Sequence, residues 1–110
     1  MRTDDLQYMP KTQNLLVKEG TTFGDAFIPY SMCCPSRASM LRGQYTHNHL
    51  VQGNGPPNGG FDKFYAQGYE NSTIATWLQS AGYSTVLLGK YLINYPGSND
   101  SSYVPPGWDE

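Results

Sequence analysis

Apolar residues in the first third of the chain lie between residues that typically start and stop helices. Pro10 is tolerated at a first helical position, the run Leu15–Val17 supplies an apolar patch, and Gly20 is a common helix stop. This pattern predicts a helix over residues 9–19. The β-forming residues at 21–28 that follow it predict a short extended segment.

A second helix is predicted over residues 35–42. Pro35 again suits the first helical position, and Gly43 is a natural C-cap after the last apolar residues. The adjacent Cys33 and Cys34 therefore stand at the N-terminus of a helix.

A third helix is predicted over residues 73–80. Ser72 is a favoured N-cap residue type, and Ile74, Trp77 and Leu78 fall on one face at helical spacing. Two residues later, the segment 83–88, Tyr-Ser-Thr-Val-Leu-Leu, has the composition of a buried strand.

Helix followed by strand is the alternation that builds α/β proteins, so we expect α/β architecture. Residues 44–69 are rich in Gly, Pro, Asn and aromatic side chains, which predicts a long ordered loop between the second and third helices. Long loops of this kind are usually functional or disordered.

Length, charge and the apolar runs of the sequence argue against a nucleic-acid-binding or membrane-spanning protein. The chain has 110 residues, enough for one domain, and a net charge of -2 gives no basic field that would hold nucleic acid. Its longest aliphatic run, Val86–Leu88, is far too short to cross a bilayer, and its first residues carry no apolar signal-peptide region.

The side chains that could act as a nucleophile or bind an anion are most concentrated in the stretch Cys33-Cys34-Pro35-Ser36-Arg37. The free N–H groups of a helix N-terminus and the fixed charge of Arg37 favour an anion. The same field would lower a thiol pKa, so either cysteine could be a reactive thiolate, whereas unpaired cysteines are also among the most buried residues. The spacing of cysteine and arginine excludes a tyrosine-phosphatase loop.

Through these residues the sequence resembles the sulfatase family. Its signature C-x-P-x-R is present from Cys33 to Arg37 and extends to Gly43 as C-C-P-S-R-A-S-x-L-x-G. The resemblance covers nearly the whole chain, in the order of the arylsulfatases and the glucosamine-6-sulfatase branch. Three further stretches carry it: Tyr45-x-His47-Asn48-His49, Gly89-Lys90-Tyr91-Leu92 and Pro105-Pro106-Gly107-Trp108.

The resemblance implies an alkaline-phosphatase-like α/β fold, with a central sheet and helices on both faces, that is incomplete in this chain. Residues 1–110 would be the N-terminal part of a sulfatase catalytic domain, truncated at both ends. The parent protein would be exported, secreted or lysosomal, although the chain itself shows no signal peptide.

The resemblance also implies a mechanism for hydrolysing a sulfate ester. Cys33 would be oxidised by a formylglycine-generating enzyme, which reads Pro35 and Arg37 as part of a linear motif, and the hydrated aldehyde would attack sulfur. Arg37 would hold the hydrate and Lys90 the sulfate. A divalent metal, most often Ca²⁺, would neutralise charge beside Cys33. Cys33 should then be accessible and close to Lys90.

The two histidines and the first acidic pair each allow more than one role. His47 and His49 could line the pocket, His47 as a substrate contact, or serve as hydrogen-bonded structural residues. Asp4 and Asp5 resemble the metal-binding T-D-D pair, but they also match a second, non-ligand acidic pair in a stretch M-R-x-D-D-L-x-Y-M-P, and they stand closer to Cys33 than the ligand pair usually does.

A competing hypothesis is that the chain is catalytically inert. Several of the family's metal ligands and catalytic residues fall outside it, and a partial sheet would leave open edges that promote association.

Overall fold

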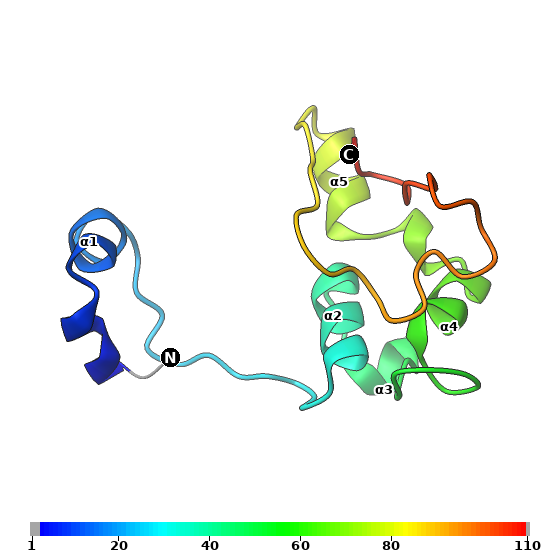
Figure 1. Ribbon diagram of the computed structural model, residues 1–110, viewed down its shortest axis with the longest axis horizontal. Coiled ribbons are helices and arrows are strands. Elements are labelled where there is room, and N and C mark those ends of the chain that lie inside the picture. The colour runs from blue at the N-terminus through cyan, green and yellow to red at the C-terminus, as the bar shows by residue number, and fades with distance from the viewer. Residues whose placement is uncertain (1–2, 110) are drawn as a thin grey trace.

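A computed structural model describes residues 3–109, all of which are helical or irregular (Figure 1). The described residues form no β-strand, and their one isolated bridge joins Gly53 to Gly59. No helix among them is long and apolar enough to cross a membrane. The α-helices are α1 (Pro10–Thr12), α2 (Cys33–Arg42), α3 (Thr46–His49), α4 (Gly60–Ala66) and α5 (Ile74–Ser80), with the 3-10 helices η1 (Thr3–Tyr8) and η3 (Tyr69–Asn71) and the π-helix η2 (Gln13–Val17).

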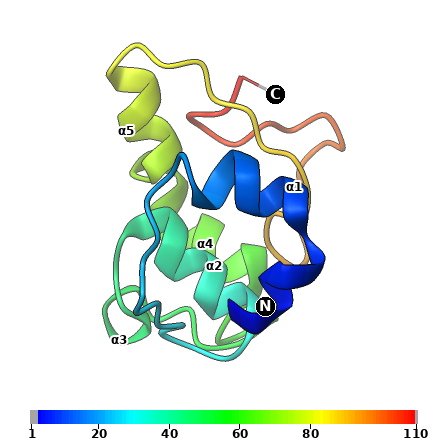
Figure 2. The same cartoon turned by 90° about the vertical axis from the view of Figure 1, so that its left-hand side faces the viewer.

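An N-terminal arm formed by η1, α1, η2 and the irregular chain up to α2 lies apart from the remaining helices (Figure 1). In Figure 2 this arm is nearest the viewer, and the other helices lie behind it. The helix predicted over residues 9–19 is confirmed, although its second half is a π-helix. Leu15 and Leu16 remain 70% and 67% exposed, so the apolar patch of this helix is not covered.

The core lies among α2, α3, α4 and the irregular chain near residue 91. Its buried apolar members are Cys34, Ala38, Val51, Phe61, Phe64, Tyr91 and Leu92. Cys34 and Ala38 are four positions apart and therefore share one face of α2. This face fixes the rotation of α2 and turns Cys33 away from the core.

The predicted second helix is confirmed with its cap. Pro35 lies in the first turn of α2, where its missing N–H costs nothing, and Gly43 ends the helix with a φ of 60°. That left-handed conformation is one that glycine adopts without a steric penalty.

The prediction of one long loop over residues 44–69 is wrong in detail. The structure places α3, α4 and the start of η3 within it. Phe61 and Phe64 are three positions apart on α4 and both fully buried, so tertiary packing stabilises a helix whose glycine-rich start suggested a loop.

The strand predicted over residues 83–88 is also wrong. The segment is irregular, and Leu88 is 91% exposed. A strand is stable only when its backbone N–H and C=O groups pair with a neighbour, and none is available among residues 3–109. The central sheet of the expected α/β fold is therefore not seen in the described chain.

Helix α5 begins one residue later than predicted. Its N-cap is Thr73, whose side chain accepts from the Thr76 N–H while the Thr76 hydroxyl accepts from the Thr73 N–H. This is a reciprocal capping box. Ser72 instead accepts a hydrogen bond from the Trp77 indole N–H.

A buried acid ties the C-terminal irregular chain to the helices. Glu70 is 4% exposed, and it accepts hydrogen bonds from the hydroxyls of Tyr91 and Tyr103 at 3.3 and 2.8 Å. Burial raises the pKa of the Glu70 carboxyl, and the two hydroxyl donors oppose that rise.

Candidate functional site

A cavity of about 500 Å³ runs along one side of α2, from Cys33 at its N-terminus to Leu41. Cys33 and Arg37 line it from α2 and Lys90 lines it from the irregular chain, beside an apolar wall that includes Leu41 and Ile74. No carboxylate is present among its described lining residues, so the polar side of the cavity carries two positive charges.

Cys33 is the first residue of α2 and is partly exposed. Its Sγ lies 3.9 Å from the Nζ of Lys90, 57 residues further along the chain. The expectation that Cys33 is accessible and close to Lys90 is therefore confirmed.

Lys90 is held in place by its backbone. The Arg37 guanidinium donates a hydrogen bond to the Lys90 carbonyl oxygen. Gly89, immediately before it, has a φ of 113°, a backbone conformation that residues other than glycine rarely adopt. The turn at Gly89 therefore brings Lys90 back over the start of α2.

Asn54 is a site residue that the sequence did not single out. Its Oδ1 accepts hydrogen bonds from the Sγ of Cys33 and from the backbone N–H of Cys34, each at 3.2 Å. The only sequence signal was its position in a Gly- and Pro-rich loop, which does not distinguish it from Asn58 in the same loop.

The two cysteines differ in environment. Cys34 is fully buried in the core, and desolvation raises the pKa of its thiol. A raised pKa disfavours the thiolate, so Cys34 is a packing residue and not a nucleophile. Cys33 donates to a carbonyl oxygen, a contact that requires the protonated thiol.

The two histidines do not join this cavity. His47 is exposed and stacks on Tyr45, with ring centroids 5.7 Å apart, and it is not among the lining residues around Cys33. The suggested contact of His47 with substrate thus has no support from its position.

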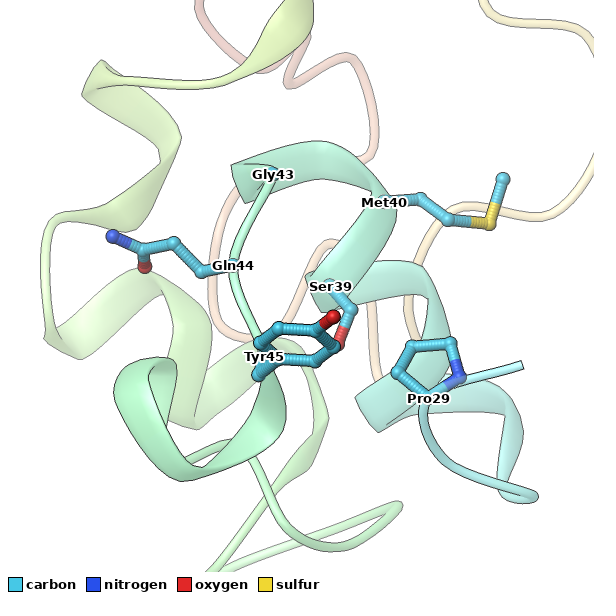
Figure 3. A pocket seen from close by; sticks show the side chains of 6 residues that line it. All are labelled: Pro29, Ser39, Met40, Gly43, Gln44 and Tyr45. Carbon is cyan, nitrogen blue, oxygen red and sulfur yellow. The ribbon is translucent and has the colours of Figure 1, made fainter. Parts of the chain in front are cut away.

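His49 is buried and pairs with Ser39 beside a second cavity of about 310 Å³. Figure 3 shows Ser39 in this cavity, with the rings of Tyr45 and Pro29 on either side. The Ser39–His49 pair resembles a serine nucleophile with its general base. The hydrogen bonds of the His49 ring show whether His49 could accept the Ser39 proton.

The tautomer of His49 excludes that chemistry. The Val51 N–H donates to Nδ1 at 3.1 Å, so the ring proton is on Nε2, which faces the Ser39 hydroxyl at 2.9 Å. Desolvation lowers the pKa of His49 and keeps the ring neutral. Because Nε2 carries the proton, His49 cannot accept one from Ser39, and the pair is a structural link between α2 and α3.

Asp4 and Asp5 lie on η1, in the arm that stands apart from α2 (Figure 1). The preceding Met1-Arg2 of the alternative acidic stretch lies outside the described residues. Ca²⁺ takes six to eight oxygen ligands as a rule, and residues 3–109 bring together no group of three or more His, Cys, Asp or Glu side chains. The described residues therefore do not supply the ligands of a complete metal site at Cys33.

Known proteins are similar in sequence to nearly the whole chain. The sulfatase family profile matches residues 2–105. A putative extracellular sulfatase Sulf-1 homolog of Caenorhabditis elegans is 42% identical over 105 residues, which cover 96% of this chain and 14% of that protein.

Two further relatives broaden the comparison. The N-acetylglucosamine-6-sulfatase of Homo sapiens is 40% identical over 103 residues, covering 91% of this chain and 19% of that protein. The arylsulfatase of Volvox carteri is 36% identical over 104 residues, covering 94% and 16%. No solved structure matches the chain significantly. The chain spans less than a fifth of the length of these relatives, and the family match across nearly all its residues shows that it belongs to the sulfatase family.

Proposed function

We propose that this chain carries the nucleophile and part of the anion site of a sulfuric ester hydrolase that cleaves sulfate esters by an arylsulfatase-type reaction. The observation that carries the proposal is the convergence of Cys33, Arg37 and Lys90 on one cavity. Cys33 would be the residue converted to formylglycine, which supplies the attacking oxygen once formed.

The residues present have distinct tasks in this proposal. The Lys90 ammonium, beside Cys33, would bind the sulfate group of the substrate. Arg37 would hold the converted side chain and also positions Lys90 through its carbonyl. An always-charged guanidinium suits both tasks, because it donates several hydrogen bonds in a fixed plane.

Sulfatases generally use a metal as well as formylglycine. We propose Ca²⁺ as the metal and the converted Cys33 as one ligand, with Asp4 and Asp5 as the weakest candidates because of their position on the arm. The described residues do not complete that site.

The proposal extends to the parent protein. It would have an alkaline-phosphatase-like α/β catalytic domain, of which residues 1–110 form an N-terminal part, and would be exported, secreted or lysosomal. Its maturation partner would be a formylglycine-generating enzyme. Two of its relatives, from Caenorhabditis elegans and Drosophila melanogaster, are named extracellular sulfatases.

The competing function is that of an inert chain that retains the motif. The absence of a metal-binding group and of any strand within residues 3–109 favours it for the 110-residue chain on its own. Both functions predict conversion of Cys33, and they differ in turnover.

Co-expression with a formylglycine-generating enzyme tests the proposal. Conversion replaces CH₂–SH by CHO, so intact mass should fall by about 18 Da. Cys33→Ala should abolish this loss, and the matched variant Cys34→Ala should keep it. A persistent thiol at Cys33 would contradict the sulfatase function, and loss of activity on iodoacetamide treatment would indicate a thiolate enzyme instead. Turnover of p-nitrocatechol sulfate by the converted chain would exclude the inert alternative.

A further inference from the structure

The carbonyl oxygen of the Asn54 side chain faces two donors at the start of α2. It accepts from the Sγ of Cys33 and from the Cys34 N–H, both at 3.2 Å. A backbone N–H can only donate, so this contact settles the orientation of the amide: Oδ1, and not Nδ2, faces Cys33. The group beside Cys33 is therefore an acceptor.

The loop around Asn54 is closed by backbone hydrogen bonds. The N–H groups of Gln52 and Gly53 both donate to the Asn58 carbonyl, at 2.7 and 3.1 Å, and the Gly60 N–H donates to the Gly53 carbonyl at 3.1 Å. These bonds bring the two ends of the loop together and hold Asn54 against α2 from a distant part of the sequence.

Glycine is required where this loop joins α4. Gly60 has a φ of +76°, and a Cβ there would meet the backbone carbonyl oxygen of Asn54 at 3.0 Å and the Gly55 Cα at 3.2 Å. The close approach of backbone to backbone leaves Asn54 little freedom to shift.

We propose that Asn54 is a positioning residue for the hydrated formylglycine at residue 33, and that it favours the gem-diol over the free aldehyde. This inference rests on the proposed function. In hydration, water adds across the C=O bond: its oxygen bonds to the carbonyl carbon, and its two hydrogens end as the two O–H groups of the diol. No oxidant or reductant is needed.

The preference follows from donors and acceptors. The thiol of Cys33 donates to Oδ1 in the structure, so the Sγ–H stands in for one hydroxyl of the diol. An aldehyde has no O–H to donate and would leave the Asn54 acceptor facing another acceptor. The second hydroxyl would remain on the side of Lys90, where the positive charge lies.

A simpler role for Asn54 is that of a helix cap. Met32, the N-cap residue of α2, makes no side-chain capping hydrogen bond, and Asn54 satisfies the Cys34 N–H in its place. A cap alone predicts an effect on stability and none on the hydration of residue 33, so hydration is the measurement that separates the two roles.

The experiment uses the 110-residue chain, labelled with ¹³C at cysteine Cβ and converted by a formylglycine-generating enzyme. Intact mass reports conversion, and ¹³C NMR reports the diol:aldehyde ratio at residue 33. Asn54→Leu keeps the approximate shape and removes the acceptor, and we expect the ratio to fall about fivefold, the equilibrium value of one ordinary hydrogen bond. Asn54→Asp keeps the acceptor, retains the cap and adds charge, so the ratio should rise.

Asn58→Leu, an exposed position in the same loop, is the matched control and should leave the ratio unchanged. Circular dichroism checks that each variant keeps its helices. An unchanged ratio in folded Asn54→Leu would overturn the inference, and if that variant does not fold, an unchanged ratio in Asn54→Asp would do so. Failure of the unsubstituted chain to convert would overturn the proposed function itself, which is a different result.

Discussion

The guanidinium of Arg37 donates a hydrogen bond to the backbone carbonyl of Lys90, 53 residues further along the chain. This bond joins the second turn of α2 to the segment after the Gly89 turn. Lys90 is therefore held near Cys33 through its main chain, and its ammonium lies beside the Cys33 Sγ on the cavity, where it can meet an anion.

Arg37→Lys should loosen the Lys90 segment. A lysine keeps the charge but lacks the planar group that reaches the carbonyl. Backbone order parameters of residues 89–92 from ¹⁵N NMR relaxation should fall from about 0.85, typical of a rigid backbone, towards about 0.6, because the bond that ties this segment to α2 is lost. The matched variant Arg42→Lys removes a different bond, from Arg42 to the Ser72 carbonyl, and should spare residues 89–92. Equal order parameters of residues 89–92 in the two variants would contradict the role of Arg37.

Lys90→Met should weaken binding of inorganic sulfate to the cavity. The variant keeps the length of the side chain and removes the charge beside Cys33, so we expect about fivefold weaker binding, the equivalent of roughly 1 kcal/mol for an exposed charge. NMR shifts of the Cys33 and Arg37 amides during a sulfate titration at constant ionic strength measure this. Lys63→Met, on α4 and outside the described cavity lining, is the control, and similar effects of the two variants would argue for general charge screening instead.

Glu70→Gln should change how stability depends on pH. Burial raises the pKa of Glu70 in the folded chain, so the folded state holds a proton that the unfolded state releases. The stabilisation is then complete below the ordinary pKa of about 4.3 and is lost as pH rises through the higher folded value.

Urea denaturation across this range checks the prediction. Gln is neutral at every pH, and its one carbonyl oxygen can still accept from either Tyr91 or Tyr103, which donate to different oxygens of Glu70. The stability of the variant should therefore be flatter between pH 4.3 and 7 than that of the unsubstituted chain, as follows from the ordinary carboxyl pKa of about 4.3. The variant should gain relative stability at pH 7. Parallel pH curves for the two proteins would show that Glu70 does not titrate with a raised pKa.

Thr73→Ala should destabilise α5 more than Ser72→Ala does. Thr73 is the N-cap in the structure, and loss of such a cap costs about 1 kcal/mol. Ser72, the cap that the sequence predicts, instead accepts a hydrogen bond from the Trp77 indole through its side chain. Thermal denaturation of both variants compares the two positions, and a larger loss for Ser72→Ala would restore the predicted cap.

The sequence alone determined the helices whose ends carry a proline near the start or a glycine just after the last turn. Helix α2 follows from Pro35 in its first turn and Gly43 at its C-cap, because both residues act through their own backbone and need no distant partner. The sulfatase signature on α2 is equally local, which is why the family could be identified before any contact was known.

Only the tertiary structure decided what the remaining segments do. Residues 83–88 have the composition of a strand but find no neighbouring strand among residues 3–109, and α4 forms in a glycine-rich stretch because Phe61 and Phe64 are buried together. Asn54 could not be chosen over Asn58 from the sequence, since its contact with Cys33 depends on a fold that brings distant positions together. Hydrogen bonds and burial between distant residues are properties of the folded chain as a whole, whereas caps and turns are properties of a few adjacent residues.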